Sequence, residues 1–523
     1  EILRCLVGSE MCIRDRPLLG MMAALIADKM RPGMVLFSVV VLFLCVGILT
    51  PKEMLEGFSN KGMITVALLF LVSEGIRQSG TLGQVIKKLL PQGKTTVFKA
   101  QLRILPSVAF ISAFLNNTPV VVIFAPIIKH WAKSVKLPAT KFLIPLSYVT
   151  ILGGICTLIG TSTNLVVHGM ILEAGYEGFT MFELGKVGIF IAIAGIIYLF
   201  IFSKRLLPDA RPDTAVPDEE VEEGEKLHRV EAVLGARFPG INKKLSDFNF
   251  QRHYGAEVKE IKTRNGQRYV DHLEDVVLRE GDTLVVMADD TFIPTWGESS
   301  VFVLLTNGND PDTSGKKKRW LALILLVLMI VGATVGELPA TKEMFPDIKL
   351  DMFFFVCITT IIMAWTNIFP ARKYTKYISW DILITIACAF AISKAMVNSG
   401  VADCVAGFII GLSDDYGPHV LLAILFVITN LFTELITNNA AAALAFPLAL
   451  SISAQLGVSP TPFFVVICMA ASASFSTPIG YQTNLIVQGI GNYKFTDFVR
   501  IGLPLNIITF LISVILIPLI WNF

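Results

Sequence analysis

Residues 114–126 read FLNNTPVVVIFAP, and this stretch decides how the whole chain is interpreted. Two asparagines, a threonine and a proline interrupt a segment that is otherwise apolar. A buried asparagine is costly unless its amide finds hydrogen-bond partners, and a proline removes a helix donor. The stretch therefore predicts a helix break that serves a purpose, inside a segment suited to lipid.

The composition of the 523-residue chain is that of a membrane protein. It is 54% hydrophobic and only 16% charged, whereas soluble domains carry about a quarter charged residues. Apolar runs of roughly membrane-spanning length recur along it; they are 33–50, 62–75, 184–203, 320–337, 350–366, 380–397 and 501–522. We expect an all-α polytopic protein embedded in lipid, with no nucleic-acid partner.

The first residues do not fit this pattern. Residues 1–16, EILRCLVGSEMCIRDR, have neither a signal-peptide layout nor a membrane pattern, and we expect them to be a non-native, adapter-derived segment. The following PLLGMMAALIADKMRP has an apolar run too short to span a bilayer. We expect residues 17–207 to form a first membrane region whose first helix is truncated.

A polar region, 208–318, separates this region from a second membrane region, 319–523. It opens with an acidic, proline-rich linker, which predicts a flexible solvated segment. The strand HRVEAVL, a short helix closed by Gly255, a hairpin turning at Asn265-Gly266 and the strand REGDTLVVMA then predict a β-α-β-β-β module at about 227–300. A structural spacer and a regulatory module are both open readings of this insert.

Two polar motifs recur in the same order in both membrane regions. FLNNTPVVVIFAP is matched by LITNNAAAALAFP at 435–447, and LIGTSTNLVVHG at 158–169 by PIGYQTNLIVQG at 478–489. If Asn117 is aligned with Asn439, 47 residues lead to Asn164 (164 − 117) and 45 lead from Asn439 to Asn484 (484 − 439). Such an order and spacing predict an internal repeat.

Loop charges predict how the repeats are oriented, because Lys and Arg concentrate on the cytoplasmic side. Basic residues crowd 77–103 and 129–141 on either side of the first motif, so this segment is predicted to enter and leave from the cytoplasm as a re-entrant hairpin. The acidic loop 171–183 should be external, and Lys316 to Arg319 and 372–376 internal. Asp403, Asp414 and Asp415 then place the second hairpin on the external side. The repeats are thus predicted to be inverted, with the insert in the cytoplasm.

Inverted repeats with interrupted helices place a binding site near the membrane midplane. Freed backbone carbonyls can ligate a small hard cation, and exposed helix N-termini attract an anion. Thr118 followed by Pro119 predicts the start of the hairpin's second arm. Gly160 and Gly480 permit close approach where the partner helix unwinds. A single Asn could simply bond to a neighbouring helix, worth about 0.6–2 kcal/mol, but four matched motifs favour a binding site.

At these motifs the sequence resembles the divalent-anion:sodium symporter family, which contains the dicarboxylate, citrate and sulfate carriers of the ion transporter superfamily. The resemblance covers 17–205 and 316–523 and implies two hairpin tips meeting two unwound helices, with sodium ions beside the tips and the anion between them. It also implies a homodimer in a bacterial inner membrane. The insert, chiefly its LREGDTLVV, resembles the C-terminal domain of potassium-conductance regulators (RCK-C, or TrkA-C) and implies a small-molecule regulator.

Site residues follow from the resemblance by position. For the substrate it implies Asn117, Thr118, Thr161, Ser162, Asn439, Ala440, Tyr481 and Gln482. For sodium it implies Asn116, Asn117, Gly160, Thr163, Asn164, Asn438, Asn439, Gly480, Thr483 and Asn484. We expect no other metal and no cofactor.

The chain departs from the family pattern at both tips. The familiar Ser-Asn-Thr is replaced by Asn116-Asn117-Thr118 and, in this alignment, by Asn438-Asn439-Ala440, so the second tip is expected to lack a hydroxyl. Sulfate or another small oxyanion is then at least as favoured as a dicarboxylate.

Glu434 breaks the symmetry, since it precedes Asn439 by five positions, where the first repeat has Ser112. An ionisable group in a membrane hairpin is a functional candidate. It could carry a proton for coupling, or it could pair with a cation such as Lys394. His168 and Glu74 are weaker candidates.

The leading hypothesis is sodium-coupled symport of sulfate or a dicarboxylate by alternating access. The alternatives are a proton-coupled exchanger or oxyanion efflux permease that uses Glu434, and a regulated ion channel, against which the absence of a TVGYG-like filter argues. The sequence indicates no paired carboxylates in a polar pocket, no Ser/His/Asp arrangement and no phosphate loop, and an enzyme is not expected.

Overall fold

The computed structural model describes residues 20–21, 24, 30–91, 93, 95–209, 228–235, 237–263, 267–289, 292, 296, 301–306, 316–344, 349–411 and 417–523. The predictions made for 1–16, for the linker 210–227, for the Asn265-Gly266 turn and for Asp414 and Asp415 lie outside these residues.

The first half of the described chain is helical. Its helices are α3 (Pro32–Cys45), α4 (Pro51–Glu56), η1 (Gly57–Ser59), α5 (Lys61–Gln78), α6 (Thr81–Leu89), α7 (Val97–Ser112), α8 (Asn117–Ser134), η2 (Ala139–Lys141), α9 (Leu143–Gly154), α10 (Ser162–Glu173) and α11 (Gly185–Leu206). Polar caps mark several starts: the Asn60 side chain accepts from the Gly62 amide at α5, and that of Thr96 from the Lys99 amide at α7.

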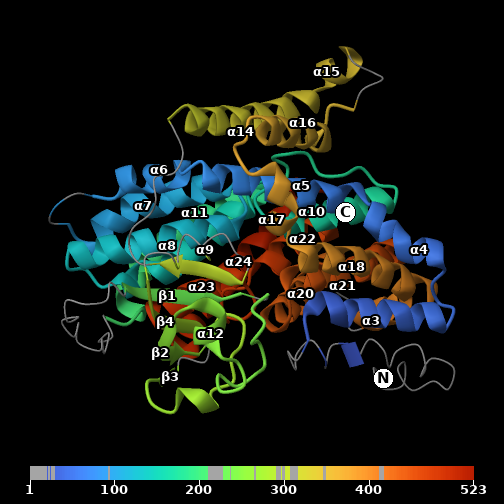
Figure 1. The fold of residues 1–523 in the computed structure, drawn as a ribbon. Coiled ribbons are helices and arrows are strands. Elements are labelled where there is room, and N and C mark those ends of the chain that lie inside the picture. Colours follow the sequence, from blue (N-terminus) through green and yellow to red (C-terminus); the bar gives the residue numbers. More distant parts are fainter. Residues whose placement is uncertain are drawn as a thin grey trace, which may run out of the picture.

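The second half is helical as well. Its helices are α14 (Lys316–Gly336), α15 (Pro339–Met344), α16 (Met352–Trp365), η4 (Ala371–Lys373), α17 (Tyr374–Tyr377), α18 (Trp380–Asn398), α19 (Val401–Gly411), α20 (Gly417–Leu435), α21 (Asn438–Leu456), α22 (Thr461–Ser472), α23 (Gln482–Gly491) and α24 (Phe495–Ile520). In this order α18 to α24 are seven α-helices of the described chain, as are α5 to α11 in the first half. In Figure 1, α14 and α16 pack together at one edge of the molecule, beside α5.

The helices carry the surface expected of a protein in lipid. Seven helical stretches of the described chain are long and apolar enough to cross a membrane. The long helix α24 exposes apolar side chains at a spacing of four residues, namely Leu503, Ile507, Leu511, Ile515 and Leu519, whereas Ile501 and Leu505 on its other face are buried. The chain is therefore a polytopic integral membrane protein.

The insert between α11 and α14 is an antiparallel five-stranded sheet with one short helix. Its elements are β1 (His228–Leu234), α12 (Phe250–Tyr254), β2 (Glu257–Lys262), β3 (Arg268–Tyr269), η3 (Leu273–Asp275), β4 (Thr283–Ala288) and β5 (Phe302–Thr306), with strand order β3-β2-β4-β1-β5. The predicted β-α-β-β-β order is confirmed, including the left-handed Gly255 that ends α12. The structure adds β5, which was not predicted.

The two faces of this sheet have different roles, because side chains alternate along a strand. Val230, Ala232 and Val286 point into the insert's own core, where Phe238 and Tyr254 pack. Val233, on the opposite face, belongs to the core of the helical region. Figure 1 shows the sheet lying against α8 and α23.

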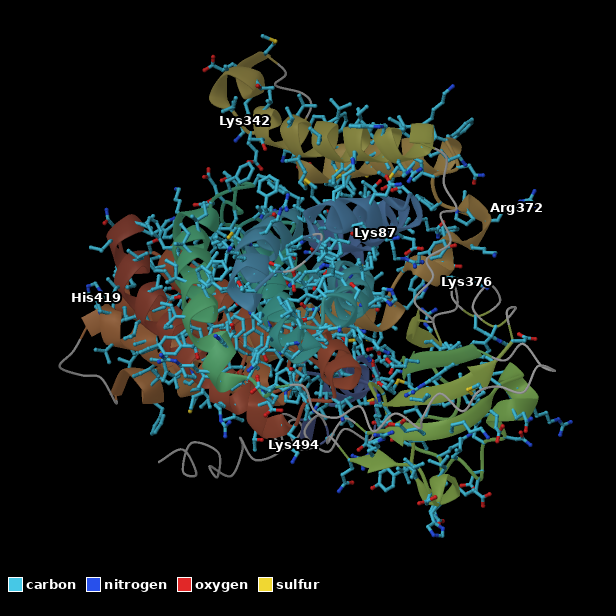
Figure 2. All side chains as sticks on the ribbon, turned by 90° about the vertical axis from the view of Figure 1, so that its left-hand side faces the viewer. Lys87, Lys342, Arg372, Lys376, His419 and Lys494 are labelled. Carbon is cyan, nitrogen blue, oxygen red and sulfur yellow. The ribbon has the colours of Figure 1, made fainter. Side chains whose placement is uncertain are left out.

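Contacts place the ends of the helices on two opposite sides. Lys129 near the end of α8 contacts Glu231 of the insert. On the other side, the rings of His419 at the start of α20 and Phe463 at the start of α22 both contact the ring of Phe523 after α24. Figure 2 shows Arg372 and Lys376 on the side of the bundle where the sheet lies and His419 on the far side. The end of α8 thus lies toward the insert, and the start of α20 lies away from it.

Candidate functional site

Two tight turns lie between paired helices, and each is fixed by a hydroxyl. Residues 113–116 join α7 to α8, and residues 436–437 join α20 to α21. The Ser112 hydroxyl donates to Asn117 Oδ1 at 2.8 Å, and the Thr433 hydroxyl donates to Asn438 Oδ1 at 2.7 Å. Both predicted polar interruptions therefore coincide with helix breaks.

Two further helices are interrupted beside these turns, as the repeated motif predicts. The helical path is broken between α9 and α10 at 155–161, and between α22 and α23 at 473–481. In each break a threonine hydroxyl accepts from a glycine amide, Thr157 from Gly160 at 3.1 Å and Thr477 from Gly480 at 3.3 Å. Equivalent hydrogen bonds thus stabilise the non-helical backbone of both breaks.

The glycines of the breaks are required by close backbone approach. A Cβ on Gly160 would lie 2.5 Å from Gly154 O and 3.0 Å from Ala113 O, and one on Gly480 would lie 2.6 Å from Thr433 O. Each turn therefore packs its backbone against the break of its own repeat. The predicted role of both glycines is confirmed.

The structure corrects the alignment of the two turns by one residue. Asn117 and Asn438 are each the first residue of a helix and each accepts from the hydroxyl five positions earlier, so Asn117 corresponds to Asn438 and not to Asn439. The distance to the next asparagine is then 47 (164 − 117) and 46 (484 − 438) residues. The helix α8 starts at Asn117 with Asn116 as N-cap, and not at Pro119 with Thr118 as N-cap, as predicted.

This correction changes which residues of the two turns are equivalent. Thr437 is now the N-cap of α21 and corresponds to Asn116, so the second turn does carry a hydroxyl. Ala440 is buried inside α21 at the position of Pro119, and the predicted missing hydroxyl there was wrong. Glu434 corresponds to Ala113 rather than to Ser112.

Side chains from each turn reach across to the other repeat. Asn117 Nδ2 donates to the Tyr481 hydroxyl at 2.6 Å, and the Thr118 hydroxyl donates to Gln482 Oε1 at 3.3 Å. In the reverse direction Asn439 Oδ1 accepts from Ser162 at 3.3 Å and from Thr163 at 3.1 Å. The two motif pairs, far apart in sequence, therefore form one continuous cluster.

Four helix N-termini meet in this cluster. They are those of α8, α10, α21 and α23. The Thr161 and Tyr481 hydroxyls lie 3.2 Å apart and connect the break between α9 and α10 with the break between α22 and α23. None of the four N-cap side chains, all within the described chain, accepts a hydrogen bond from its helix. Free N-terminal amides and aligned helix dipoles make a local positive potential without a charged side chain.

Burial separates the predicted residues into two groups. The predicted sodium residues Thr163, Asn164, Thr483 and Asn484 are fully buried. By contrast, the residues that face the gap between the repeats are half-buried, namely Asn116, Thr118, Ser162, Tyr481 and Gln482. A small cavity beside the first turn is lined by Asn116 and Ser162 together with apolar residues of α5 and α14.

Asn164 has a buried polar atom to which no other described residue hydrogen-bonds. Its Nδ2 donates to Thr157 O at 2.9 Å, but its buried Oδ1 has no hydrogen-bond partner among the described residues. Its equivalent Asn484 differs, because Asn484 Oδ1 accepts from Ser147 at 2.7 Å. A buried acceptor without a donor costs on the order of 1–3 kcal/mol, unless a cation or a water completes it.

Glu434 is held by the second break and not by a lysine. Its carboxylate accepts from the amides of Ser476 and Thr477, both at 2.9 Å, and from Asn506 Nδ2 at 2.7 Å. Lys394 is exposed and forms no ion pair with it in the described structure, so that alternative was wrong. The carboxylate fastens the loop between α22 and α23, a contact that Ala113 cannot make in the first repeat.

Several residues of the cluster were not predicted. Ser112, Thr433, Thr157 and Thr477 fix the turns and breaks, and Ser147 on α9 contacts both Thr483 and Asn484. A signal existed, because Ser112, Thr157 and Thr477 lie within seven residues of the polar motifs. Ser147 and Asn506 are single polar residues in apolar helices, and only the fold brings them to the site.

Comparisons with known proteins agree with this architecture. A family model described as citrate transporter (CitMHS) matches residues 22–452 and 344–523. An uncharacterized transporter of Synechocystis is 30% identical over 92% of this chain and 93% of its own length. A probable sodium/sulfate cotransporter of Chlamydomonas reinhardtii is 32% identical over 54% of this chain and 31% of its own. A sodium-dependent dicarboxylate transporter of Staphylococcus saprophyticus is 25% identical over 28% of each chain.

Proposed function

Since this chain belongs to the citrate transporter (CitMHS) family, we propose that it is a secondary active transporter that couples inward sodium flow to the import of a divalent anion. The family consists of transporters, so the chain is not an enzyme. The observation that carries the proposal is the meeting of four free helix N-termini with buried amide and hydroxyl oxygens.

The two helical series are proposed to be inverted repeats, with α7–α8 and α20–α21 as re-entrant hairpins. The support is that the end of α8 lies toward the insert and the start of α20 lies away from it. The basic stretches 129–141 and 372–376 lie on the insert's side. By the distribution of positive charge this side is the cytoplasm. Such a pair can alternate access around a fixed central site.

The anion is proposed to bind between the repeats, at the N-termini of α8, α10, α21 and α23. Thr118, Ser162, Tyr481 and Gln482 offer hydroxyls and an amide there. Asn439 and Gln482 both reach across the gap, which favours a compact anion. We therefore propose sulfate as the first substrate and a dicarboxylate as the second, in keeping with relatives named sodium/sulfate and dicarboxylate transporters.

Sodium is proposed to bind at the buried oxygens beside each turn. Hard cations take oxygen ligands from amides, hydroxyls and backbone carbonyls. The unpartnered Asn164 Oδ1, next to the open backbone at Gly160, is a ligand of this kind. By correspondence Asn438, Gly480 and Asn484 would serve the second ion.

The test is uptake into proteoliposomes with an inward sodium gradient imposed or omitted. Radiolabelled sulfate and succinate are tried separately, with Asn117→Ala as the matched variant. We expect sodium-driven uptake of sulfate that the variant lacks. Gradient-independent behaviour, or no uptake of either anion by folded protein, would contradict the proposal.

A second candidate is proton coupling through Glu434. It is favoured by a half-buried carboxylate that has no cation partner among the described residues. Glu434→Gln should then abolish the response to a pH gradient and leave the sodium response. Because Gln places a donor against two backbone amides, thermal stability must be measured alongside. A pH response equal to that of the wild type excludes this candidate.

The insert, the assembly and the location complete the proposal. The sheet is proposed to be a cytoplasmic RCK-C-like domain that a small molecule regulates, supported by the β-α-β-β-β order of β1, α12, β2, β3 and β4. A homodimer in a bacterial inner membrane is proposed from the family resemblance.

A further inference from the structure

The helix α10 packs closely against the start of α5. A Cβ on Gly62 of α5 would lie 3.0 Å from both Leu165 O and Gly169 Cα. A Cβ on Gly169 would in turn lie 2.7 Å from Asn60 Oδ1. The Leu165–Gly169 face of α10 is therefore fitted to the start of α5 without spare space.

The corresponding helix α23 packs against the insert instead. Gly160 corresponds to Gly480 and Asn164 to Asn484, a constant offset of 320 (480 − 160), so Leu165 and Gly169 correspond to Leu485 and Gly489. A Cβ on Gly281 of the insert would lie 3.6 Å from Leu485 Cβ, and one on Gly489 would lie 3.7 Å from Thr283 Cβ and in contact with Thr283 Oγ1. The same face of α23 is thus fitted to the start of β4.

The insert also grips α8, the helix that shares the site with α23. Lys129 on α8 pairs with Glu231 on β1 at 3.0 Å, and Lys262 on β2 reaches the same carboxylate at 3.4 Å. Next to Glu231 on this face, Val233 is buried in the core of the helical region. These contacts are independent of those at α23.

A third contact ties the insert to the surrounding frame. Arg237 donates to Ile378 O at 3.2 Å, just before α18, the counterpart of α5. The insert therefore contacts the segment before α18 as well as α8 and α23, beside which the sheet lies (Figure 1). Thr283 Oγ1, at the contact with Gly489, is buried and has no hydrogen-bond partner among the described residues, so shape and not polarity joins the two surfaces.

We propose that the insert is a working part of the transport machinery: its sheet is the packing surface, or wall, against which α23 lies, just as α5 is the packing surface for α10. The helix pair whose N-termini carry Thr118 and Gln482 can change its position only by sliding along this sheet or leaving it. This assignment goes beyond the proposed symport and does not depend on which anion is carried. It differs from a tethered regulatory domain, whose contact with the helices is dispensable.

A reversible cross-link tests the wall. In a chain whose eight native cysteines are replaced, Thr283→Cys with Gly489→Cys places two Cβ atoms about 3.7 Å apart, which suits a disulfide. The control pair, Glu257→Cys with Met287→Cys, joins facing residues of β2 and β4 inside the insert. Sodium-driven sulfate uptake is measured after oxidation and again after reduction.

We expect the 283–489 pair to oxidise readily and uptake to fall at least tenfold, with recovery on reduction, while oxidation of the control pair changes nothing. Failure of the pair to cross-link, or full uptake by the cross-linked protein, overturns the inference.

A second measurement separates this inference from the symport proposal. If the reduced protein takes up no anion, the proposed function has failed. Hydrogen exchange then tests by itself whether the sheet is the packing surface for α23. Glu231→Lys should speed the amide exchange of residues 482–491 several-fold by releasing the sheet. Unchanged exchange there would overturn the inference without reference to transport.

Discussion

Asn117 and Asn438 occupy the same place in the two repeats, each as the first residue of a helix at the centre of the molecule. Asn117 joins three elements, because its Oδ1 accepts from Ser112 and its Nδ2 donates to Tyr481. Asn438 accepts from Thr433 in the same manner. Equal geometry implies that the two side chains have equal weight in function.

Replacing either asparagine by alanine should therefore have the same effect. We expect Asn117→Ala and Asn438→Ala each to reduce sodium-dependent uptake at least tenfold, because each removes the side-chain bond that fixes a turn and leaves the hydroxyl only a backbone carbonyl, Thr150 O or Ala471 O, as acceptor. Uptake as a function of sodium concentration is the measurement. Ala440→Ser is the control, because residue 440 lies inside α21 at the position that corresponds to Pro119. The added hydroxyl should leave uptake unchanged. A gain in uptake by that variant would restore the alignment of Asn117 with Asn439.

The Tyr481 hydroxyl is the polar bridge between the first turn and both breaks. It contacts Asn117 at 2.6 Å and Thr161 at 3.2 Å. Tyr481→Phe keeps the ring and removes only this bridge, so we expect the KM for the anion to rise about tenfold, equivalent to about 1.4 kcal/mol, with kcat nearly unchanged. Initial rates over a range of anion concentrations measure both. A fall in kcat at constant KM would show that the hydroxyl serves motion and not binding.

Among the elements, glycines decide how closely the helices pack. Gly153 on α9 faces Ala109 on α7, where a Cβ would lie 2.8 Å from the Ala109 carbonyl carbon. Gly188 on α11 and Gly502 on α24 likewise meet the backbone of the two breaks, at Ile155 and Phe475. These contacts are to main-chain atoms, which cannot rotate away.

Gly153→Ala should therefore destabilise the protein by about 3 kcal/mol or more, as overpacking of a tight core does. The measurement is the thermal midpoint of the detergent-purified protein. Gly407→Ala in α19 is the matched control, because its Cβ would have only Gln455 Oε1 at 3.7 Å within reach, and the helical preference for Ala over Gly should add up to about 1 kcal/mol. Equal midpoints for the two variants would contradict the packing argument.

At this scale the sequence predicts a good deal. Polar residues inside apolar helices predicted both turns and both breaks, because such residues are costly elsewhere in a membrane. The register of the second turn was missed because Asn-Asn occurs in both motifs, and only the hydroxyl five positions earlier shows which asparagine starts the helix. The strand Phe302–Thr306 was missed because it lies just beyond residue 300, where the predicted module was expected to end. The partners of Glu434 could not be predicted, since Asn506 lies 72 residues further along the chain.

For the whole molecule, the ion pairs at the junction between sheet and helices share one half-buried carboxylate, that of Glu231. Burial alone would raise the pKa of Glu231, but Lys129 and Lys262 more than offset this and lower it from 4.5 to about 2. Because the folded pKa lies below the unfolded one, the ion pairs contribute fully above pH of about 4.5. Their contribution is lost as the pH falls through the folded pKa of about 2.

Glu231→Gln should thus lower stability at neutral pH by about 3 kcal/mol, because two lysines lose their partner. This deficit should shrink as the solution is acidified below the ordinary pKa of the carboxyl. Thermal midpoints of wild type and variant, measured from pH 7 down to pH 3, check the prediction. A difference between them that is constant over this range would show that Glu231 is not the titrating group at the junction.

The four helix N-termini at the centre have a consequence for how the family diversifies. The attraction they exert comes from peptide groups, which every amino acid carries alike, while the amides, hydroxyls and phenol around them are side chains that single mutations exchange. A lineage can therefore try one new cargo after another, altering the size and shape it accepts, and still inherit its preference for negative charge. In such a protein the sign of the cargo is encoded by the fold, and its identity by a handful of residues.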